Sequence, residues 1–119
     1  MQCKNILVVE DDSSVRQIMQ DVLEIEGYHV ITAKDGKEGI ERLRTLSPQP
    51  CLILLDLMMP ETNGWKFLDF QRADPLLANI PVIICSAYYE SAKTVRANAI
   101  VEKPVSLDTL LDTVHEFCA

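Results

Sequence analysis

Five polar residues with chemically useful side chains follow short apolar runs of the sequence: Asp11, Asp12, Asp56, Ser86 and Lys103. Carboxylates that lie within a few ångströms of one another repel unless a cation sits among them. Because oxygen ligands suit a hard ion, that cation would be Mg²⁺ before Zn²⁺. A lysine opposite the carboxylates can pair with an anion, and a serine hydroxyl can donate a hydrogen bond to it. Together these groups would stabilise a phosphoryl group in transit, with one carboxylate as the nucleophile that carries it as an acyl phosphate.

Each of these features is common when it stands alone. An Asp-Asp pair after a strand is usually a solvated turn or the start of a helix, and a Lys-Pro pair is frequent in loops. The whole set is far less probable by chance, because one polar feature follows each of several apolar runs in turn. We therefore base the prediction of a phosphoryl-transfer site on the set and not on any single residue.

The apolar runs that precede these residues are predicted strands. Each run is short and rich in branched side chains, as expected for strands buried on both faces of a sheet. The runs are Ile6–Val9, Tyr28–Ala33, Cys51–Leu55, Val82–Cys85 and a weak run at Ala99–Val101. Segments with helical spacing of apolar residues separate them. These segments are centred on Val15–Leu23, Ile40–Leu46, Trp65–Leu68 and Leu107–Val114.

The ends of the predicted helices carry typical signals. Ser13 or Ser14 would cap the first helix and Gly27 would close it, while Ser106 would cap the last. The segment from Tyr88 to Asn98, between the last two predicted strands, is polar and has little periodicity. A helix in this segment, the fourth along the chain, is therefore expected to be short or poorly ordered.

Strands and helices alternate, and each connection is long enough for a crossover. The pattern predicts an α/β fold, in which a doubly wound parallel sheet of five strands carries helices on both faces. Ligands of such sheets bind beyond the carboxyl ends of the strands, where the polar residues named above are expected to converge.

Composition limits the classes of protein that the chain can belong to. Its 119 residues are 48% hydrophobic and 24% charged, as is typical of one domain with a real core. The net charge of -7 argues against direct binding to nucleic acid, which depends on cationic side chains. No apolar run has the roughly 20 residues of a membrane helix, and the start of the chain has no signal-peptide profile. We expect a single cytoplasmic domain over residues 1–119.

The cysteines and histidines offer no metal or redox motif. Cys3, Cys51, Cys85 and Cys118 are too far apart in sequence for a CxxC pair or a zinc knuckle. Cys51 and Cys85 lie in apolar runs, so we expect buried reduced thiols and no disulfide framework. The two histidines, His29 and His115, are expected to be ordinary surface or edge residues.

The sequence resembles the receiver domain of two-component response regulators over essentially its whole length. The matching motifs are VVEDD at 8–12, LLDLMMPETNG at 54–64, CSA at 85–87 and EKP at 102–104. In this resemblance the family's acidic pair matches Asp11 and Asp12, and its phosphoacceptor matches Asp56. The family's hydroxyl residue and lysine match Ser86 and Lys103. The resemblance implies a flavodoxin-like sheet of strand order 2-1-3-4-5, the order known for the chemotaxis receiver.

The resemblance also implies a phosphodonor and a cofactor. A histidine kinase or a histidine phosphotransfer protein would present phosphohistidine, and Asp56 would attack the phosphorus in line. Mg²⁺ would be held by Asp12, Asp56 and the backbone carbonyl of Met58, with Asp11 binding it through water. The protein would thus be a regulatory phosphoacceptor that catalyses only its own phosphorylation and dephosphorylation.

The implied switch depends on two further residues. Lys103 would pair with the phosphoryl group, and Ser86 would move to hydrogen-bond it, which shifts the populations of two receiver states and controls a downstream partner. The family commonly has an aromatic residue three positions before the lysine, where this chain has Ile100. Because of that difference and of the short segment before Ile100, we predict that the output uses a different surface or a different relay.

Other functions on the same type of fold fit less well. A pseudo-receiver that acts as a constitutive binding module would lack the acidic pocket, which this sequence retains. A phosphohydrolase of the haloacid-dehalogenase type needs a second Asp two residues after the nucleophile, where this chain has Met58. A dinucleotide-binding or flavodoxin domain needs a glycine-rich or hydroxyl-rich first loop, and EDDSS lacks the phosphate-binding glycines.

Overall fold

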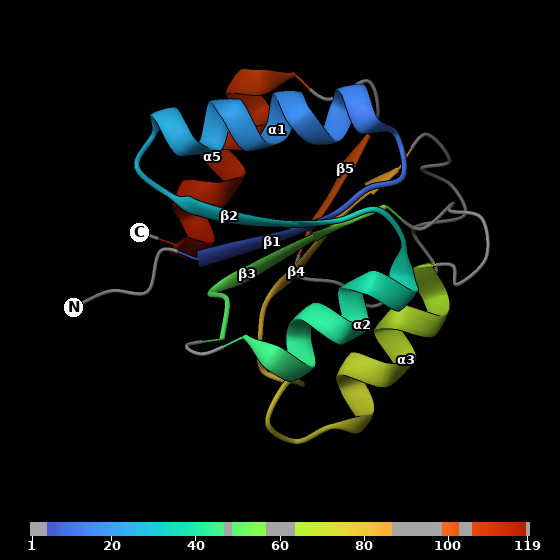
Figure 1. Cartoon of the computed structure of the whole chain (residues 1–119). Coiled ribbons are helices and arrows are strands. Elements are labelled where there is room, and N and C mark those ends of the chain that lie inside the picture. Colours follow the sequence, from blue (N-terminus) through green and yellow to red (C-terminus); the bar gives the residue numbers. More distant parts are fainter. Residues whose placement is uncertain (1–4, 47–48, 57–63, 87–98, 103–105, 119) are drawn as a thin grey trace.

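A central parallel sheet separates two layers of helices. The computed structural model describes residues 5–46, 49–56, 64–86, 99–102 and 106–118. Helices α1 (Ser13–Ile25) and α5 (Leu107–Cys118) cover one face of the sheet, and α2 (Gly36–Thr45) and α3 (Gly64–Ala73) cover the other (Figure 1). The helix expected between Tyr88 and Asn98 lies outside the described residues. None of the helices in the described ranges is long and apolar enough to cross a membrane.

The sheet has the predicted strand order. Its strands are β1 (Asn5–Val9), β2 (His29–Ala33), β3 (Leu52–Leu55), β4 (Val82–Ser86) and β5 (Ala99–Glu102). All neighbouring strands are parallel, in the order β2-β1-β3-β4-β5. Val9 lies opposite Ala33 on one side and Leu55 on the other, and Leu55 lies opposite Ile84. The carboxyl ends of the central strands are therefore level with one another.

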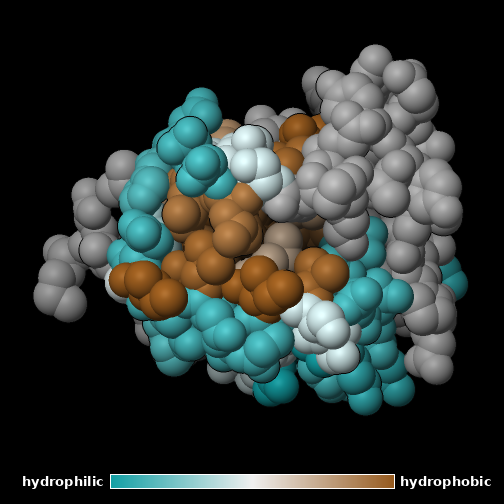
Figure 2. All heavy atoms as spheres, turned by 90° about the horizontal axis from the view of Figure 1, so that it is seen from above, coloured by the Kyte–Doolittle hydropathy of each residue, from teal (hydrophilic) through white to brown (hydrophobic). Residues whose placement is uncertain are grey.

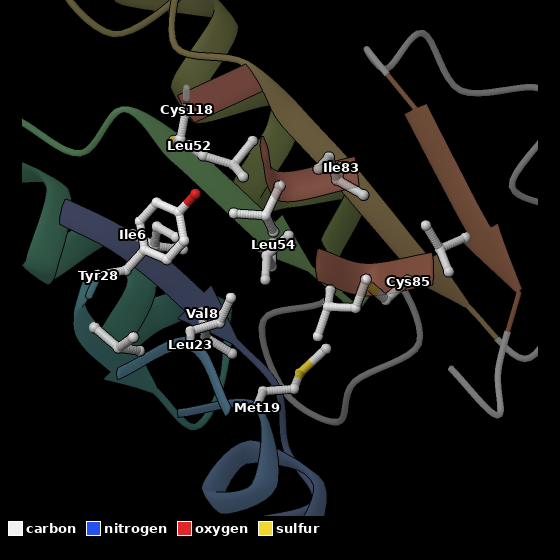
Figure 3. Packing of buried hydrophobic residues seen from close by; sticks show 14 residues of the cluster. Ile6, Val8, Met19, Leu23, Tyr28, Leu52, Leu54, Ile83, Cys85 and Cys118 are labelled. Carbon is white, nitrogen blue, oxygen red and sulfur yellow. The ribbon is translucent and has the colours of Figure 1, made fainter. Parts of the chain in front are cut away.

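Alternate residues of each strand pack into two separate cores, because successive side chains of a strand point to opposite faces. The core under α1 and α5 takes Ile6, Val8, Leu52, Leu54 and Ile83 from the strands (Figure 3). The core under α2 and α3 takes Leu7, Val9, Ile53, Leu55 and Ile84. All ten side chains are at most 1% exposed, which confirms the prediction of strands buried on both faces for β1, β3 and β4. The edge strand β2 departs from it, because His29 is exposed and Ile31 and Thr32 are half-buried.

Both ends of α1 are fixed by local backbone chemistry. Asp12 is the N-cap, and its Oδ1 accepts the amide hydrogens of Ser14 at 2.9 Å and Val15 at 3.1 Å. The predicted cap, Ser13 or Ser14, is wrong by one or two residues because Asp12 is an equally good cap that precedes them. At the other end Gly27 closes the helix as predicted, with φ +95°. The amide of Tyr28 donates to the carbonyl of Leu23 at 3.1 Å, which completes a Schellman motif.

The outer face formed by α1 and α5 is partly apolar. Figure 2 looks onto this face and shows apolar side chains gathered between hydrophilic rims. The large apolar residues exposed on the two helices are Ile18 and Ile25 on α1 and Leu107 on α5.

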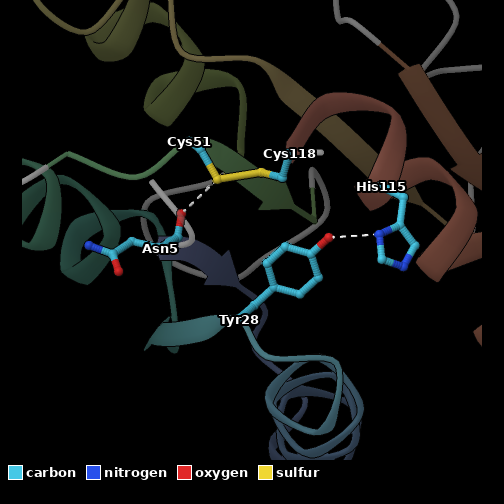
Figure 4. The surroundings of a disulfide bond; sticks show 5 residues. All are labelled: Asn5, Tyr28, Cys51, His115 and Cys118. Carbon is cyan, nitrogen blue, oxygen red and sulfur yellow. Dashed lines mark hydrogen bonds between the residues drawn. A yellow bond between two sulfur atoms is a disulfide. The ribbon is translucent and has the colours of Figure 1, made fainter. Parts of the chain in front are cut away.

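A disulfide joins Cys51, next to the start of β3, to Cys118, the last residue of α5 (Figure 4). The prediction of a reduced Cys51 was therefore wrong. Residues 67 positions apart in sequence are brought together by the packing of α5 on the sheet, with their Cα atoms 6.2 Å apart, a separation that disulfides favour. Cys85 is buried and reduced, as predicted.

His115 makes specific contacts that its isolated position in the sequence did not indicate. Its Nδ1 lies 2.9 Å from the hydroxyl of Tyr28, and its Nε2 lies 3.7 Å from a carboxylate oxygen of Glu26 (Figure 4 shows the first contact). A neutral imidazole with its proton on Nε2 would accept from the tyrosine and face the carboxylate with its N–H. Burial of Tyr28, and secondarily the negative charge of Glu26, raise the pKa of the phenol above 10.0.

Replacing Tyr28 by phenylalanine should change how stability depends on pH. At neutral pH, Tyr28→Phe removes the hydrogen bond to His115 and should cost about 1 kcal/mol of unfolding free energy. The phenol contributes fully below pH 10, where it is neutral in both states. Above pH 10 the unfolded chain ionises first, so the contribution of Tyr28 is lost as the pH rises through the folded pKa.

Urea unfolding of both proteins between pH 7 and 11 tests this expectation. The advantage of the wild type should shrink above pH 10, whereas His29→Gln, at an exposed histidine, should follow the wild type throughout. A constant difference between wild type and Tyr28→Phe across the range would contradict the role given to burial.

Gly39 allows α2 to lie close to α3 and β1. A methyl group at this position would lie 2.8 Å from Cε2 of Phe67 and 3.1 Å from Cγ2 of Val9. Phe67 is fully buried, and side chains in close-packed cores have little room to move. Glycine at this helical position is therefore required by packing.

Gly39→Ala should destabilise the fold even though alanine favours a helix by about 1 kcal/mol over glycine. Overpacking of this kind costs roughly 1–3 kcal/mol, so we expect a net loss in chemical denaturation. In a Phe67→Leu background the loss from Gly39→Ala should be clearly smaller, because the overlapping ring is gone. Equal losses in the two backgrounds would show that the ring is not the cause.

Candidate functional site

Two buried acids lie side by side at the carboxyl edge of the sheet. Glu10 follows β1 and Asp56 follows β3, and the two strands end level because Val9 pairs with Leu55. The backbone extends the ladder by one step, since the amide of Asp56 donates to the carbonyl of Val9 at 3.0 Å. On the other side of β1, the amide of Glu10 donates to the carbonyl of Ala33, also at 3.0 Å. Glu10 is 2% and Asp56 6% exposed.

Asp11 completes a group of three carboxylates. One oxygen atom each from Glu10, Asp11 and Asp56 lies within 4.8 Å of the others, and Asp11 is the exposed member. Negative charges at this distance repel, and the repulsion is strongest where burial removes water. A donor set made only of oxygen fits a hard divalent cation such as Mg²⁺ better than a softer metal.

Asp12 is not a member of this group, although the sequence analysis assigned it to the metal site. Its Oδ1 is instead the cap of α1, where two backbone N–H groups and the positive end of the helix dipole satisfy its charge. The acidic pair that the structure places beside Asp56 is therefore Glu10 and Asp11. The sequence did contain a signal for Glu10, because Glu10 and Asp56 each come directly after the last apolar residue of a run.

Arg16 stabilises the loop that carries the acidic pair by hydrogen bonds to its backbone. Its Nη1 donates to the carbonyl oxygen of Glu10 at 2.8 Å and lies 3.5 Å from the carbonyl oxygen of Asp11. The guanidinium thus holds the backbone of the loop. The carboxylate of Glu10 also accepts the amide hydrogen of Asp12 at 3.3 Å. Both the backbone carbonyl and the side chain of Glu10 are therefore fixed by hydrogen bonds to residues at the start of α1 or just before it.

The remaining predicted site residues are placed only in part. Ser86 is the last residue of β4, in register with Glu102 of β5, so its backbone lies at the same edge of the sheet as the acids. Met58 and Lys103 lie outside the described residues. Ile100, the residue at the position of the family's usual aromatic side chain, is half-buried against the core under α2 and α3.

The family model of the response regulator receiver domain matches residues 6–115, which include every residue of the acidic group. The chain belongs to this family.

Curated relatives of this receiver domain are response regulators. The polar-differentiation response regulator DivK of Brucella anthropi is 28% identical over 119 residues, with 96% of this chain and 95% of DivK covered. Because each protein covers almost all of the other, the similarity is not confined to one motif.

Solved structures of receiver domains have the same fold. Chemotaxis protein CheY4 of Vibrio cholerae is 27% identical with a TM-score of 0.85, and the match covers 97% of this chain and 98% of that one. Response regulator TrrA of Thermotoga maritima is 27% identical with a TM-score of 0.82, at 96% and 98% coverage, and its structure was solved in complex with Mg²⁺-BeF. The doubly wound fold predicted from the sequence is confirmed.

Substitutions should distinguish the roles of Asp11 and Asp12, the two aspartates of the receiver's first loop. Asp12→Ala should lower the unfolding free energy by about 1 kcal/mol through loss of the cap, and Asp12→Ser should restore most of it. Neither should change the Mg²⁺ dissociation constant, measured by calorimetry, by more than about twofold. Asp11→Asn should weaken Mg²⁺ binding at least about tenfold, because it removes a carboxylate from the group. A tenfold loss of Mg²⁺ affinity in Asp12→Ser would show that Asp12 does take part in metal binding.

Proposed function

We propose that this receiver domain is the phosphoacceptor of a two-component system and that Asp56 accepts the phosphoryl group. The observation that supports this function best is the meeting of Glu10, Asp11 and Asp56 at the carboxyl edge of the sheet. Asp56 follows β3, the middle strand of the sheet, and its amide donates to the carbonyl of Val9 in the neighbouring strand β1. A nucleophile needs such fixed geometry in order to attack in line.

The acidic group would hold Mg²⁺. Asp11 and Asp56 offer carboxylate oxygens, Glu10 lies close enough to bind directly or through water, and the carbonyl of Met58 is a further ligand by resemblance to the family. When bound, Mg²⁺ neutralises the charge that develops on the transferring phosphoryl group. Arg16 and the cap at Asp12 keep the loop in place, so the carboxylates need little rearrangement.

The reaction transfers a phosphoryl group from nitrogen to oxygen. A carboxylate oxygen of Asp56 attacks phosphorus, the P–N bond to the donor histidine breaks, and the imidazole leaves with its electron pair and takes up a proton. Asp56 then carries an acyl phosphate. By resemblance to the family, Lys103 pairs with the phosphoryl oxygens and the hydroxyl of Ser86 donates a hydrogen bond to them, which favours the active receiver state.

The biological setting follows from the family and the charge of the chain. Receiver domains interact with histidine kinases and with downstream effectors, and we propose a histidine kinase or a histidine phosphotransfer protein as the donor. We further propose that residues 1–119 form one cytoplasmic regulatory domain, which turns over no substrate other than its own phosphoryl group. The net charge of -7 supports a protein partner over nucleic acid as the direct target.

Incubation with acetyl phosphate and Mg²⁺ tests the proposal directly. Intact-mass spectrometry should find a gain of one phosphoryl group in the wild type and none in Asp56→Asn. Addition of EDTA should slow the gain at least about a hundredfold, since the metal neutralises the developing charge. Asp69→Asn, at an exposed aspartate of α3, is the matched control and should be phosphorylated like the wild type. Phosphorylation of Asp56→Asn at the wild-type rate would overturn the assignment.

A further inference from the structure

The disulfide lies at the opposite end of β3 from the acidic group. Cys51 comes immediately before β3, and Asp56 comes immediately after it. Cys118 is 6% exposed, whereas Cys51 is half-buried, so Cys51 is the more accessible half of the pair. Cys51 is therefore the side from which a small thiol would attack the bond.

The fold can also accommodate the reduced pair. Sγ of Cys51 lies 3.2 Å from the carbonyl oxygen of Asn5, the contact drawn as a dashed line in Figure 4. A disulfide sulfur has no proton, so in the oxidised protein this contact is not a hydrogen bond. A Cys51 thiol would have one, and the Asn5 carbonyl is already in place to accept it.

The end of α5 has other anchors besides the disulfide. Leu110 and Val114 are fully buried in the core under α1 and α5, and His115 contacts Tyr28 and Glu26. These contacts do not depend on the sulfur–sulfur bond. Cleavage of the disulfide would thus loosen the last turn of α5 and leave the rest of the helix packed.

A permanent structural disulfide is not what this domain needs. Each of its two cores contains twelve or more buried side chains, unlike the cores of small secreted domains that depend on disulfides. In the cytoplasmic setting given under the proposed function, disulfides are mostly transient or redox-sensing.

We propose that Cys51 and Cys118 form a reversible thiol–disulfide site through which low-molecular-weight thiols control the mobility of the last turn of α5. A thiolate such as that of glutathione attacks Sγ of Cys51, the S–S bond breaks, and Cys118 leaves as a thiolate that takes up a proton. A second thiolate attacks the mixed disulfide and releases the Cys51 thiol and glutathione disulfide. Two thiols thus supply the two electrons that reduce the protein, and glutathione disulfide drives the reverse reaction.

The test uses the full chain in glutathione buffers of stepwise ratio of thiol to disulfide. Each sample is labelled in its native state with an excess of a maleimide, then quenched with acid and mapped by peptide mass spectrometry. Cys51 and Cys118 should become labelled together over a single transition, while the buried Cys85 stays unlabelled as an internal reference for the folded state. Amide exchange of residues 116–118, which follow the anchor at His115, should accelerate several-fold on reduction, and exchange in β1 and β3 should stay unchanged.

Two variants make the result specific. Cys118→Ser should show the fast exchange of residues 116–118 at every glutathione ratio. Asp56→Asn should show the same redox transition as the wild type, so the outcome does not depend on the phosphoacceptor assignment. Labelling of both cysteines at all ratios would show that no disulfide forms and would overturn the proposal. Labelling of Cys85 in the same transition would overturn the proposal too. It would mean that the domain unfolds when the disulfide is reduced, so the disulfide would be structural and not a reversible control site.

Discussion

The register between β1 and β3 is the constraint on which the functional edge of this receiver depends. Because Val9 lies opposite Leu55, the next residues, Glu10 and Asp56, directly follow neighbouring strands at the same level. A slip of one residue would send every side chain of β1 to the other face, and it would part the two acids. The slip is prevented by both cores at once, since β1 and β3 bury their side chains on each face of the sheet.

The first loop divides its three acids between two tasks. Asp12 is satisfied by the amides of α1 and fixes where the helix begins, while Glu10 and Asp11 remain beside Asp56. Arg16, one turn into the same helix, holds the carbonyl of Glu10. The helix therefore holds the loop at Glu10 and at Asp12. The repulsion among the carboxylates cannot easily move the backbone of the loop away from Asp56.

The sequence predicts most of this architecture because strands buried on both faces are short, apolar and easy to recognise. It also locates Asp56, which directly follows such a run. It does not locate the start of α1, because Asp12, Ser13 and Ser14 are all good caps, and the choice among them decides which acids remain for the site. Nor does it predict the bond between Cys51 and Cys118 or the contact of His115 with Tyr28, because separation in sequence says nothing about how the end of α5 packs.

The disulfide also changes how the chain carries tension. When the protein is pulled between Asn5 and Cys118, force in the oxidised chain passes from Cys118 directly to Cys51, so only residues 5–51 can extend. That segment reaches about 150 Å when stretched, against roughly 380 Å for the reduced chain. Strand β3, the residue Asp56 that follows it, and everything up to α5 lie inside the closed loop and bear none of the load. Under tension, the oxidised domain would lengthen only through β1, α1, β2 and α2.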